Sequence, residues 1–300
     1  MKISKLTLGT VQLGLDYSIH NPKPTLEESK SILRTAFDLG INTLDTAREY
    51  GSSEEVIGSF LEEGLNPMVV TKFKVNPSHL KNPGTAFNEA FDSISRSLKM
   101  LKLDKIPILL FHKGPDHSLE DTCKVIPGIL RKLKDLDLIE KGGVSVFEPE
   151  EIKELMEYED IQAFQVPVNI FDHRLMKSGV LEYLDSSGRI VFARSIFLKG
   201  LFFNSERQLK GIFEEAVPYI RKLQEIVSRT NLSVAEMAFL FVRDIPGITS
   251  LVVGADNVQQ IEQNSKLMNK AALKPGLREE IYESFASVPK KVITPHIWNI

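Results

Sequence analysis

Short apolar runs alternate with longer amphipathic segments along the whole chain. Each run is mostly apolar and rich in β-branched residues, which is typical of strands that are buried on both faces of a sheet. No linker-like or compositionally biased stretch interrupts the alternation. The pattern predicts eight strands, at residues 5–10, 41–46, 68–73, 106–112, 142–147, 163–168, 190–195 and 250–254.

The segments between these runs carry apolar residues at helical spacing. Residues 32–37 and 86–101 show this pattern, and so does the segment around Cys123. Three sequences of the form S/T-x-x-E precede apolar runs, starting at Thr25, Ser52 and Ser233, and each predicts a capped helix start. The chain therefore repeats strand and helix units from end to end.

A strand and helix unit repeated eight times can close into a (β/α)8 barrel or open into a doubly wound sheet. An open sheet that binds a dinucleotide normally carries G-x-G-x-x-G after its first strand, and this sequence contains no G-x-G. We therefore predict that residues 1–300 form a single (β/α)8 TIM-barrel domain.

Composition and charge narrow the classes of function. A net charge of −3 provides no field to attract a polyanion, so nucleic-acid binding is not expected. No apolar run approaches the roughly 18 residues that a membrane span requires, so no membrane association is expected either. The single cysteine, Cys123, cannot form an intramolecular disulfide, and the first ten residues lack the features of a signal peptide. These features predict a cytoplasmic protein.

Four polar residues stand at or just after the ends of neighbouring predicted strands: Asp45, Tyr50, Lys72 and His112. The carboxyl ends of the strands carry the active site in a TIM barrel. These side chains can satisfy one another as a cluster of charges and hydrogen bonds. Spacing alone leaves both a catalytic and a loop-capping role open. The spacing of His112 and His117 fits no zinc site, so we expect no metal.

Residues 40–61, GINTLDTAREYGSSEEVIGSFL, are similar to the motif G-x-N-x-x-D-T-A-x-x-Y-G-x-x-E-x-x-I/L-G of the aldo-keto reductase family. The resemblance extends over nearly the whole chain, from LTLGTVQLG to GADNVQQIEQN. It implies a TIM barrel, a nicotinamide cofactor and a catalytic tetrad at Asp45, Tyr50, Lys72 and His112. The intervening blocks that carry it are VVTKF, SLKMLKLDKIPILLFH, KGGVSVF, FQVPVNIFDHR and VFARSIFLKGLF.

The chemistry of carbonyl reduction accounts for that set of residues. The reaction needs a hydride on carbon and a proton on oxygen, and free tyrosine is a weak acid with a pKa of about 10. A lysine ammonium beside Tyr50 favours the phenolate, and Asp45 keeps Lys72 charged and oriented. His112 can hydrogen-bond the substrate oxygen. Tyr50 is thus the expected proton donor.

The resemblance also implies which residues contact the cofactor. Ser145 and Gln165 occupy the positions that hold the nicotinamide amide, although Val146 replaces the asparagine that usually follows the serine. Arg194 stands where the family usually has an aromatic residue stacked on the nicotinamide. It either stacks there as a guanidinium or binds an anionic substrate. The remaining implied contacts are Gly9, Thr10, Asp45, Ser195, Leu198, Lys199, Gly200, Gly254, Ala255, Gln260, Gln263 and Asn264.

The last block bears on the choice between the two nicotinamide cofactors. Members selective for a 2′-phosphate commonly place a lysine or arginine there, but GADNVQQIEQN has neither and includes Asp256. The family resemblance favours NADP(H), and NAD(H) is the alternative. Trp298, near the carboxyl end, either lines the substrate pocket or packs on the barrel.

Three functions are compatible with these residues. The first is an NAD(P)H-dependent oxidoreductase that interconverts an aldehyde or ketone, such as a sugar-derived carbonyl, and an alcohol. The second is a cofactor-bound sensing or regulatory subunit without significant turnover. The third is a barrel isomerase or lyase with Lys72 as nucleophile, which the neighbouring Asp45 disfavours because a nucleophilic lysine must be unpaired. The tetrad favours the oxidoreductase with a small carbonyl or alcohol substrate, and the sequence predicts no oligomeric state.

Overall fold

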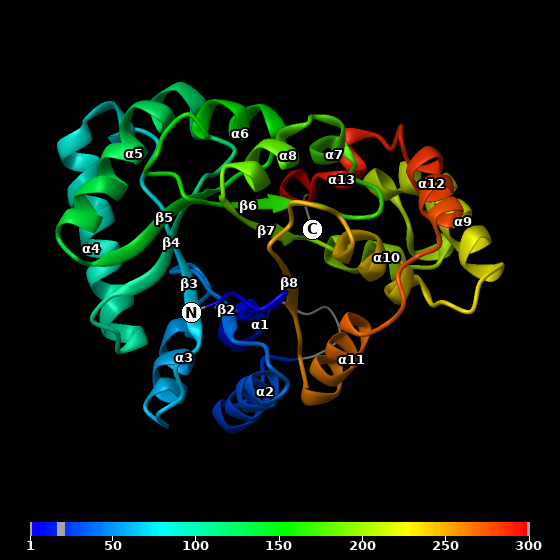
Figure 1. The fold of residues 1–300 in the computed structure, drawn as a ribbon, viewed down its shortest axis with the longest axis horizontal. Coiled ribbons are helices and arrows are strands. Elements are labelled where there is room, and N and C mark those ends of the chain that lie inside the picture. Colours follow the sequence, from blue (N-terminus) through cyan, green and yellow to red (C-terminus); the bar gives the residue numbers. More distant parts are fainter. Residues whose placement is uncertain (1, 17–21, 299–300) are drawn as a thin grey trace.

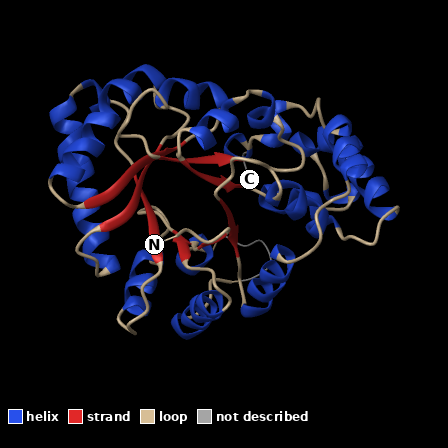
Figure 2. Ribbon diagram, viewed as in Figure 1, coloured by secondary structure: helices blue, strands red, loops and turns tan. Residues whose placement is uncertain are grey.

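Eight parallel strands form a closed barrel in a computed structural model that describes residues 2–16 and 22–298. Each strand pairs with the next in sequence, and β8 pairs with β1 to close the ring. Helices surround this ring, so the predicted (β/α)8 architecture is confirmed (Figures 1 and 2). The strands are β1 (Leu6–Gly9), β2 (Thr43–Asp45), β3 (Met68–Phe73), β4 (Ile106–His112), β5 (Ile139–Ser145), β6 (Ala163–Pro167), β7 (Ile190–Arg194) and β8 (Ser250–Gly254).

The observed strands fall on all eight predicted runs. The bounds of β3, β4 and β8 are the predicted ones, and the others differ by a few residues. The largest difference is at β5, which begins at Ile139 rather than at residue 142. Ile139 pairs with Ile106 and is buried, whereas Glu140 is exposed and Lys141 half-buried. Because these two charged residues interrupt the apolar run, the hydrophobic pattern predicts too late a start for the strand.

The helices cover the outside of the barrel and bury apolar stripes against it. The predicted caps at Thr25 and Ser233 are confirmed, since each side chain accepts a hydrogen bond from the residue three positions on. Ser52 instead accepts a hydrogen bond from Lys23 Nζ, at 2.7 Å, and caps nothing. The helices are α1 (Val11–Gly14), α2 (Leu26–Asp38), α3 (Ser53–Leu61), α4 (Pro83–Leu101), α5 (Leu119–Asp135), α6 (Pro149–Leu155), α7 (Arg174–Lys177), α8 (Val180–Ser186), α9 (Val217–Ser228), α10 (Val234–Arg243), α11 (Val258–Met268), α12 (Pro275–Ser284) and α13 (Lys290–Ile293).

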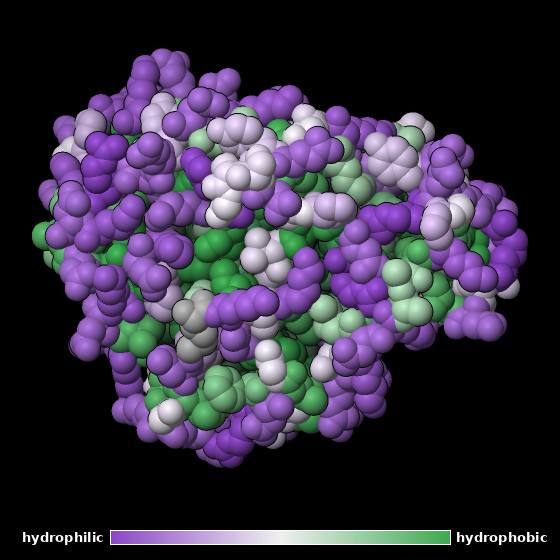
Figure 3. All heavy atoms as spheres, in the orientation of Figure 1, coloured by the Kyte–Doolittle hydropathy of each residue, from purple (hydrophilic) through white to green (hydrophobic). Residues whose placement is uncertain are grey.

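Apolar side chains fill two zones, one inside the barrel and one between the strands and the helices. The inner zone comprises Val70, Ile108, Leu110, Ala163 and Phe192. Hydrophilic residues cover much of the outer surface, and hydrophobic ones show mainly towards the middle of the face in Figure 3. The cavity that polar side chains border lies beyond this packed interior, where the strands end.

The carboxyl-terminal segment contributes to that end of the barrel. Residues 293–295 border the cavity that opens there. Trp298 does not border this cavity: its indole packs edge-on against Phe213, with ring centroids 4.9 Å apart, and Nε1 donates to the Lys291 carbonyl at 2.8 Å. Trp298 therefore packs on the barrel. Within the described ranges, no helix is both long and apolar enough to cross a membrane.

Candidate active site

A cavity of about 370 Å³ opens at the carboxyl ends of the strands. Eleven of the predicted site residues border it: Gly9, Thr10, Asp45, Tyr50, His112, Gln165, Arg194, Ser195, Leu198, Lys199 and Gly254. The predicted residues that do not border it are Lys72, Ser145, Gly200, Ala255, Gln260, Gln263 and Asn264. The barrel thus brings together at one cavity side chains that are up to 245 residues apart, from Gly9 to Gly254.

A buried ion pair lies at the base of the cavity. Lys72 is 1% exposed, and its Nζ lies 2.8 and 2.9 Å from the two carboxylate oxygens of Asp45. Nζ also donates to the Thr46 carbonyl at 2.8 Å, so all three ammonium hydrogens can be satisfied. Burial acts to lower the pKa of Lys72, but Asp45 and Tyr50 together outweigh it and the pKa is raised. Lys72 is therefore a permanent cation beneath the cavity.

Tyr50 lies above this cation, on the loop between β2 and α3. The Lys72 ammonium is 5.0 Å from the centre of the Tyr50 ring, and Tyr50 borders the cavity. Tyr50 is thus accessible from the cavity and lies beside the Lys72 ammonium.

His112 completes the predicted tetrad from the end of β4. Its ring borders the cavity, and its Nδ1 lies 3.2 Å from the Glu49 carboxylate. Burial lowers the pKa of His112, and Glu49 opposes that effect only partly. The structure thus brings Asp45, Tyr50, Lys72 and His112 together, from three neighbouring strands and one loop.

A second buried carboxylate, that of Glu54, links the loop that carries Tyr50 to strand β3, which carries Lys72. Glu54 is 1% exposed and accepts a hydrogen bond from Thr71 Oγ1 at 2.7 Å. Its other oxygen pairs with Arg48 at 2.7 Å, and the Arg48 amide donates to the Lys72 carbonyl. Both partners of Glu54 thus adjoin the tetrad: Thr71 precedes Lys72 in β3, and Arg48 belongs to the loop that carries Tyr50.

Gln165 and Ser145 form a chain of polar contacts that ends on Asp45. Gln165 Nε2 donates to Asp45 Oδ1 at 2.6 Å, and Ser145 Oγ donates to Gln165 Oε1 at 3.3 Å. Both side chains are 1% exposed, but only Gln165 borders the cavity. Ser145 is thus behind Gln165 and holds its amide in place.

Arg194 extends from the end of β7 into the wall of the cavity. Its guanidinium lies 5.0 Å from the centre of the Phe147 ring. It donates to the Val146 carbonyl at 3.1 Å and to Ser195 Oγ at 3.2 Å. The contacts with Val146 and the Phe147 ring, just after β5, fix a positive charge at this side of the cavity.

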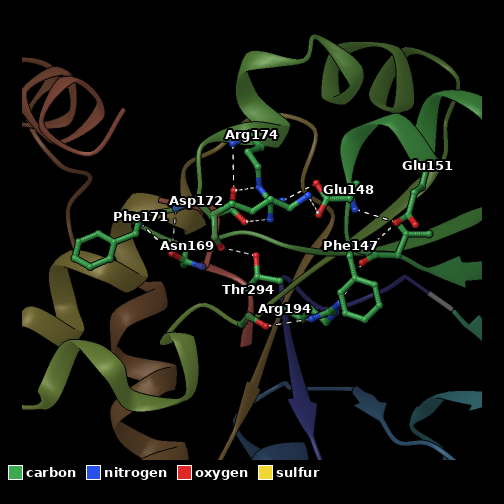
Figure 4. A network of polar contacts seen from close by, with 12 residues as sticks. Phe147, Glu148, Glu151, Asn169, Phe171, Asp172, Arg174, Arg194 and Thr294 are labelled. Atoms are coloured by element: carbon green, nitrogen blue, oxygen red, sulfur yellow. Dashed lines mark hydrogen bonds and ion pairs between the residues drawn. The ribbon is translucent and has the colours of Figure 1, made fainter. Parts of the chain in front are cut away.

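A second guanidinium, that of Arg174, borders the same side (Figure 4). Two of its nitrogens contact the Asp172 carboxylate, at 2.8 and 2.7 Å, and a third contacts Glu148 at 2.7 Å. This bidentate geometry is the strong form of an arginine–carboxylate pair. Two carboxylates therefore hold Arg174 in place and balance its charge.

The loop after β7 has an unusual backbone. Ser195, Leu198, Lys199 and Gly200 have φ values of +62°, +46°, +51° and +82°. Residues other than glycine rarely adopt this left-handed region, where each costs on the order of 1 kcal/mol. Lys199 borders the cavity, and burial lowers the pKa of its ammonium. Strained turns of this kind present backbone amides to anions.

The wall of the cavity beside β1 and β8 carries a buried polar atom, in the side chain of Gln12. Gln12 Oε1 has no hydrogen-bond partner among the described residues. A Cβ on Gly254 would lie 2.2 Å from Gln12 Nε2, so the Gln12 amide packs against the bare backbone of Gly254. An orphaned amide oxygen, a backbone without a side chain and the strained loop with Lys199 together fit an extended polar ligand such as a dinucleotide.

The other predicted cofactor contacts of the last block, Ala255, Gln260, Gln263 and Asn264, lie between β8 and the middle of α11 and do not border the cavity. Ala255 is 1% exposed. Gln260 Oε1 accepts from the Asp256 amide at 2.8 Å, and Asn257 caps the helix by accepting from the Gln260 amide. The side chain of Gln260 thus orders the loop after β8.

Several cavity residues were not anticipated from the sequence, namely Gln12, Phe147, Arg174 and Thr294, and neither was the contact between Glu49 and His112. Arg174 ends the block FQVPVNIFDHR, so a signal for it was present. Thr294 carried none, because the path of the carboxyl-terminal segment depends on tertiary packing.

Comparisons with known proteins identify the family of the chain. The sequence model described as "Aldo/keto reductase family" matches residues 5–281. The chain is 25% identical over 303 residues to L-glyceraldehyde 3-phosphate reductase of Escherichia coli (strain K12), covering 89% of this chain and 86% of that protein. It is 23% identical over 326 residues to a probable voltage-gated potassium channel subunit beta of Arabidopsis thaliana, covering 96% of both.

A solved structure shares the fold. The aldo-keto reductase AKR11C1 from Bacillus halodurans, in its holo form, superposes with a TM-score of 0.79 at 21% identity, covering 96% of this chain and 94% of that one. The similarity thus extends over almost the full barrel.

Proposed function

The chain belongs to the aldo/keto reductase family and is an NAD(P)-dependent oxidoreductase that interconverts carbonyl compounds and alcohols, and from this premise we propose that Tyr50 is its proton donor. The observation that carries the proposal is the buried Lys72–Asp45 pair beneath Tyr50 at the cavity. We also propose that residues 1–300 act as one domain.

The described side chains support a division of roles. A bound nicotinamide would supply or accept the hydride. Tyr50 gives its hydroxyl proton to the developing alkoxide, and Lys72 stabilises the phenolate that remains. Asp45 holds Lys72 in place through two contacts with Nζ. His112 borders the cavity and hydrogen-bonds the substrate oxygen.

The same cavity offers groups for a nicotinamide cofactor. Gln165 would lie at the nicotinamide, with Ser145 holding the Gln165 amide. The loop with Ser195, Leu198 and Lys199 would bind the pyrophosphate through backbone amides and one ammonium. Gln12 is an added candidate, because its free Oε1 can accept a ligand hydrogen bond. We propose that both NADP(H) and NAD(H) bind, since residues 254–264 include no lysine or arginine.

The charges around the cavity support a substrate class. Arg174 and Arg194 both border the cavity, and the Arg194 guanidinium lies against the Val146 carbonyl, Ser195 Oγ and the Phe147 ring. We propose that Arg194 attracts an anionic group on a small, sugar-derived aldehyde or ketone. The relative named L-glyceraldehyde 3-phosphate reductase acts on a carbonyl of this kind, which agrees with the proposal.

Two measurements test the proposal. Fluorescence titrations with NADPH and NADH give both dissociation constants, and we expect them to differ by less than about a hundredfold, or 2.7 kcal/mol. A larger preference for NADPH would mean that a cation from elsewhere reaches the 2′-phosphate. A panel of phosphorylated and uncharged sugar aldehydes is then followed at 340 nm. Tight cofactor binding without turnover of any carbonyl would favour a regulatory subunit instead.

A further inference from the structure

Glu49 makes a contact that the proposed mechanism does not use. It lies on the loop that carries Tyr50, and its Oε2 is 3.2 Å from Nδ1 of His112 at the end of β4. The two side chains are 35% and 23% exposed, so the contact is partly shielded from water. Burial acts to raise the pKa of Glu49, but the hydrogen bond with His112 and the charge of Lys74 outweigh it, and the pKa is lowered. Glu49 is therefore a carboxylate near neutral pH.

A carboxylate constrains where the imidazole carries its proton. An ionised carboxylate only accepts hydrogen bonds, so Nδ1 must carry a hydrogen to bond with Glu49. A neutral His112 then has a bare Nε2, the nitrogen that remains for a ligand in the cavity. A bare nitrogen can accept a hydrogen bond from an alcohol, but it cannot donate one to a carbonyl oxygen. Only the protonated imidazole can donate from Nε2 while it keeps its bond with Glu49.

We propose that Glu49 is a positioning residue that fixes the Nδ1–H tautomer of His112, so that protonated His112 binds the carbonyl compound and neutral His112 binds the alcohol. This inference rests on the proposed function of the site. According to this inference, His112 takes up a proton when the carbonyl compound binds. This proton is separate from the one that Tyr50 transfers.

The charges that face His112 set the direction of the pH dependence. Burial lowers its pKa, and the ammonium groups of Lys72 and Lys74 lower it further, while Glu49 raises it. His112 is therefore mainly neutral at pH 7 to 8. Carbonyl binding must then draw a proton from solvent, and the KM for the carbonyl should rise about tenfold per pH unit above the pKa of His112.

Histidine-selective ¹⁵N NMR tests the tautomer without any turnover. Long-range ¹H–¹⁵N spectra distinguish Nδ1–H from Nε2–H imidazoles, and a His112→Asn variant assigns the signal. At pH 8 we expect wild-type His112 to be the Nδ1–H tautomer, and Glu49→Leu to convert most of it to Nε2–H. An Nε2–H imidazole in the wild type, or an unchanged tautomer in Glu49→Leu, would overturn the proposal.

Kinetics give the second arm of the test. Between pH 6.5 and 8.5 we expect the carbonyl KM to rise roughly a hundredfold in the wild type and less than threefold in Glu49→Leu, because an Nε2–H imidazole donates without being protonated. Asp116→Asn is the matched control, since Asp116 is an exposed carboxylate four residues beyond His112. It should keep the wild-type slope. Equal slopes in the wild type and Glu49→Leu would refute the role of Glu49.

If no carbonyl is turned over at all, the proposed function fails, and the NMR result still decides whether Glu49 sets the tautomer. Melting temperatures and cofactor dissociation constants of both variants should match the wild type, which shows that the fold and the cofactor site are intact.

Discussion

The two sides of the cavity are built differently. The side formed by β2, β3 and β4 carries Asp45, Lys72 and His112 at strand ends, and the contacts of Asp45 with Lys72 and of His112 with Glu49 span 27 and 63 residues of the sequence. The side formed by β5, β6 and β7 contains Arg174 and Arg194 and is completed by the carboxyl-terminal segment. The first side concentrates the reacting groups, whereas the second gathers cations and an aromatic ring from distant segments.

This difference shows how one barrel separates chemistry from recognition. The first side depends on strand register, which the buried core fixes, so its side chains have little freedom. The second side depends on loops and on a terminal segment, which can change without disturbing the barrel. We therefore expect substitutions on the first side to abolish the reaction and substitutions on the second to change what reacts.

The sharpest test of the first side is Tyr50→Phe. We expect kcat for carbonyl reduction to fall at least a thousandfold, because the proton donor is lost, while the cofactor dissociation constant stays within threefold. Steady-state kinetics and a fluorescence titration measure the two quantities. A variant that retains more than about a tenth of the wild-type kcat would exclude Tyr50 as the proton donor.

Lys72→Met is expected to be the next most damaging change. It leaves the Asp45 carboxylate buried without its ammonium partner, so we expect kcat to fall about a hundredfold and stability to fall by about 3–5 kcal/mol. Denaturant unfolding and steady-state kinetics provide both numbers. The double variant Asp45→Asn, Lys72→Met should recover much of the stability but none of the activity. Recovery of activity would place the charge pair outside the mechanism.

Prediction from the sequence succeeded for the strands and the residues at their ends, and it failed for contacts made by loops and by the terminal segment. All eight strands could be predicted, because each is a short apolar run that two packed faces require. The ends of those strands located Asp45, Lys72 and His112. The contact of Glu49 with His112 could not be predicted, because it crosses from a loop to a strand 63 residues away. Thr294 was also missed, because only tertiary packing brings the terminal segment to the cavity.

Arg194→Tyr tests the second side and should have the smallest effect. We expect KM for a phosphorylated aldehyde to rise about tenfold, KM for an uncharged aldehyde to stay within threefold, and kcat to change little. The ratio of the dissociation constants for oxidised and reduced cofactor should not change. A shift of that ratio towards tighter binding of the oxidised form would show that Arg194 stacks on the nicotinamide instead.

The left-handed residues after β7 have a consequence for how this protein can evolve. Glycine at position 199 would relieve an unfavourable backbone conformation, so selection for thermal stability alone would favour it. The same change would delete the ammonium that borders the cavity. Glycine at position 198 would likewise relieve an unfavourable backbone conformation, but it would delete a side chain that is fully buried. A lineage under pressure for heat resistance must therefore find its gains elsewhere in the barrel, and this loop should change slowly for as long as the ligand is needed.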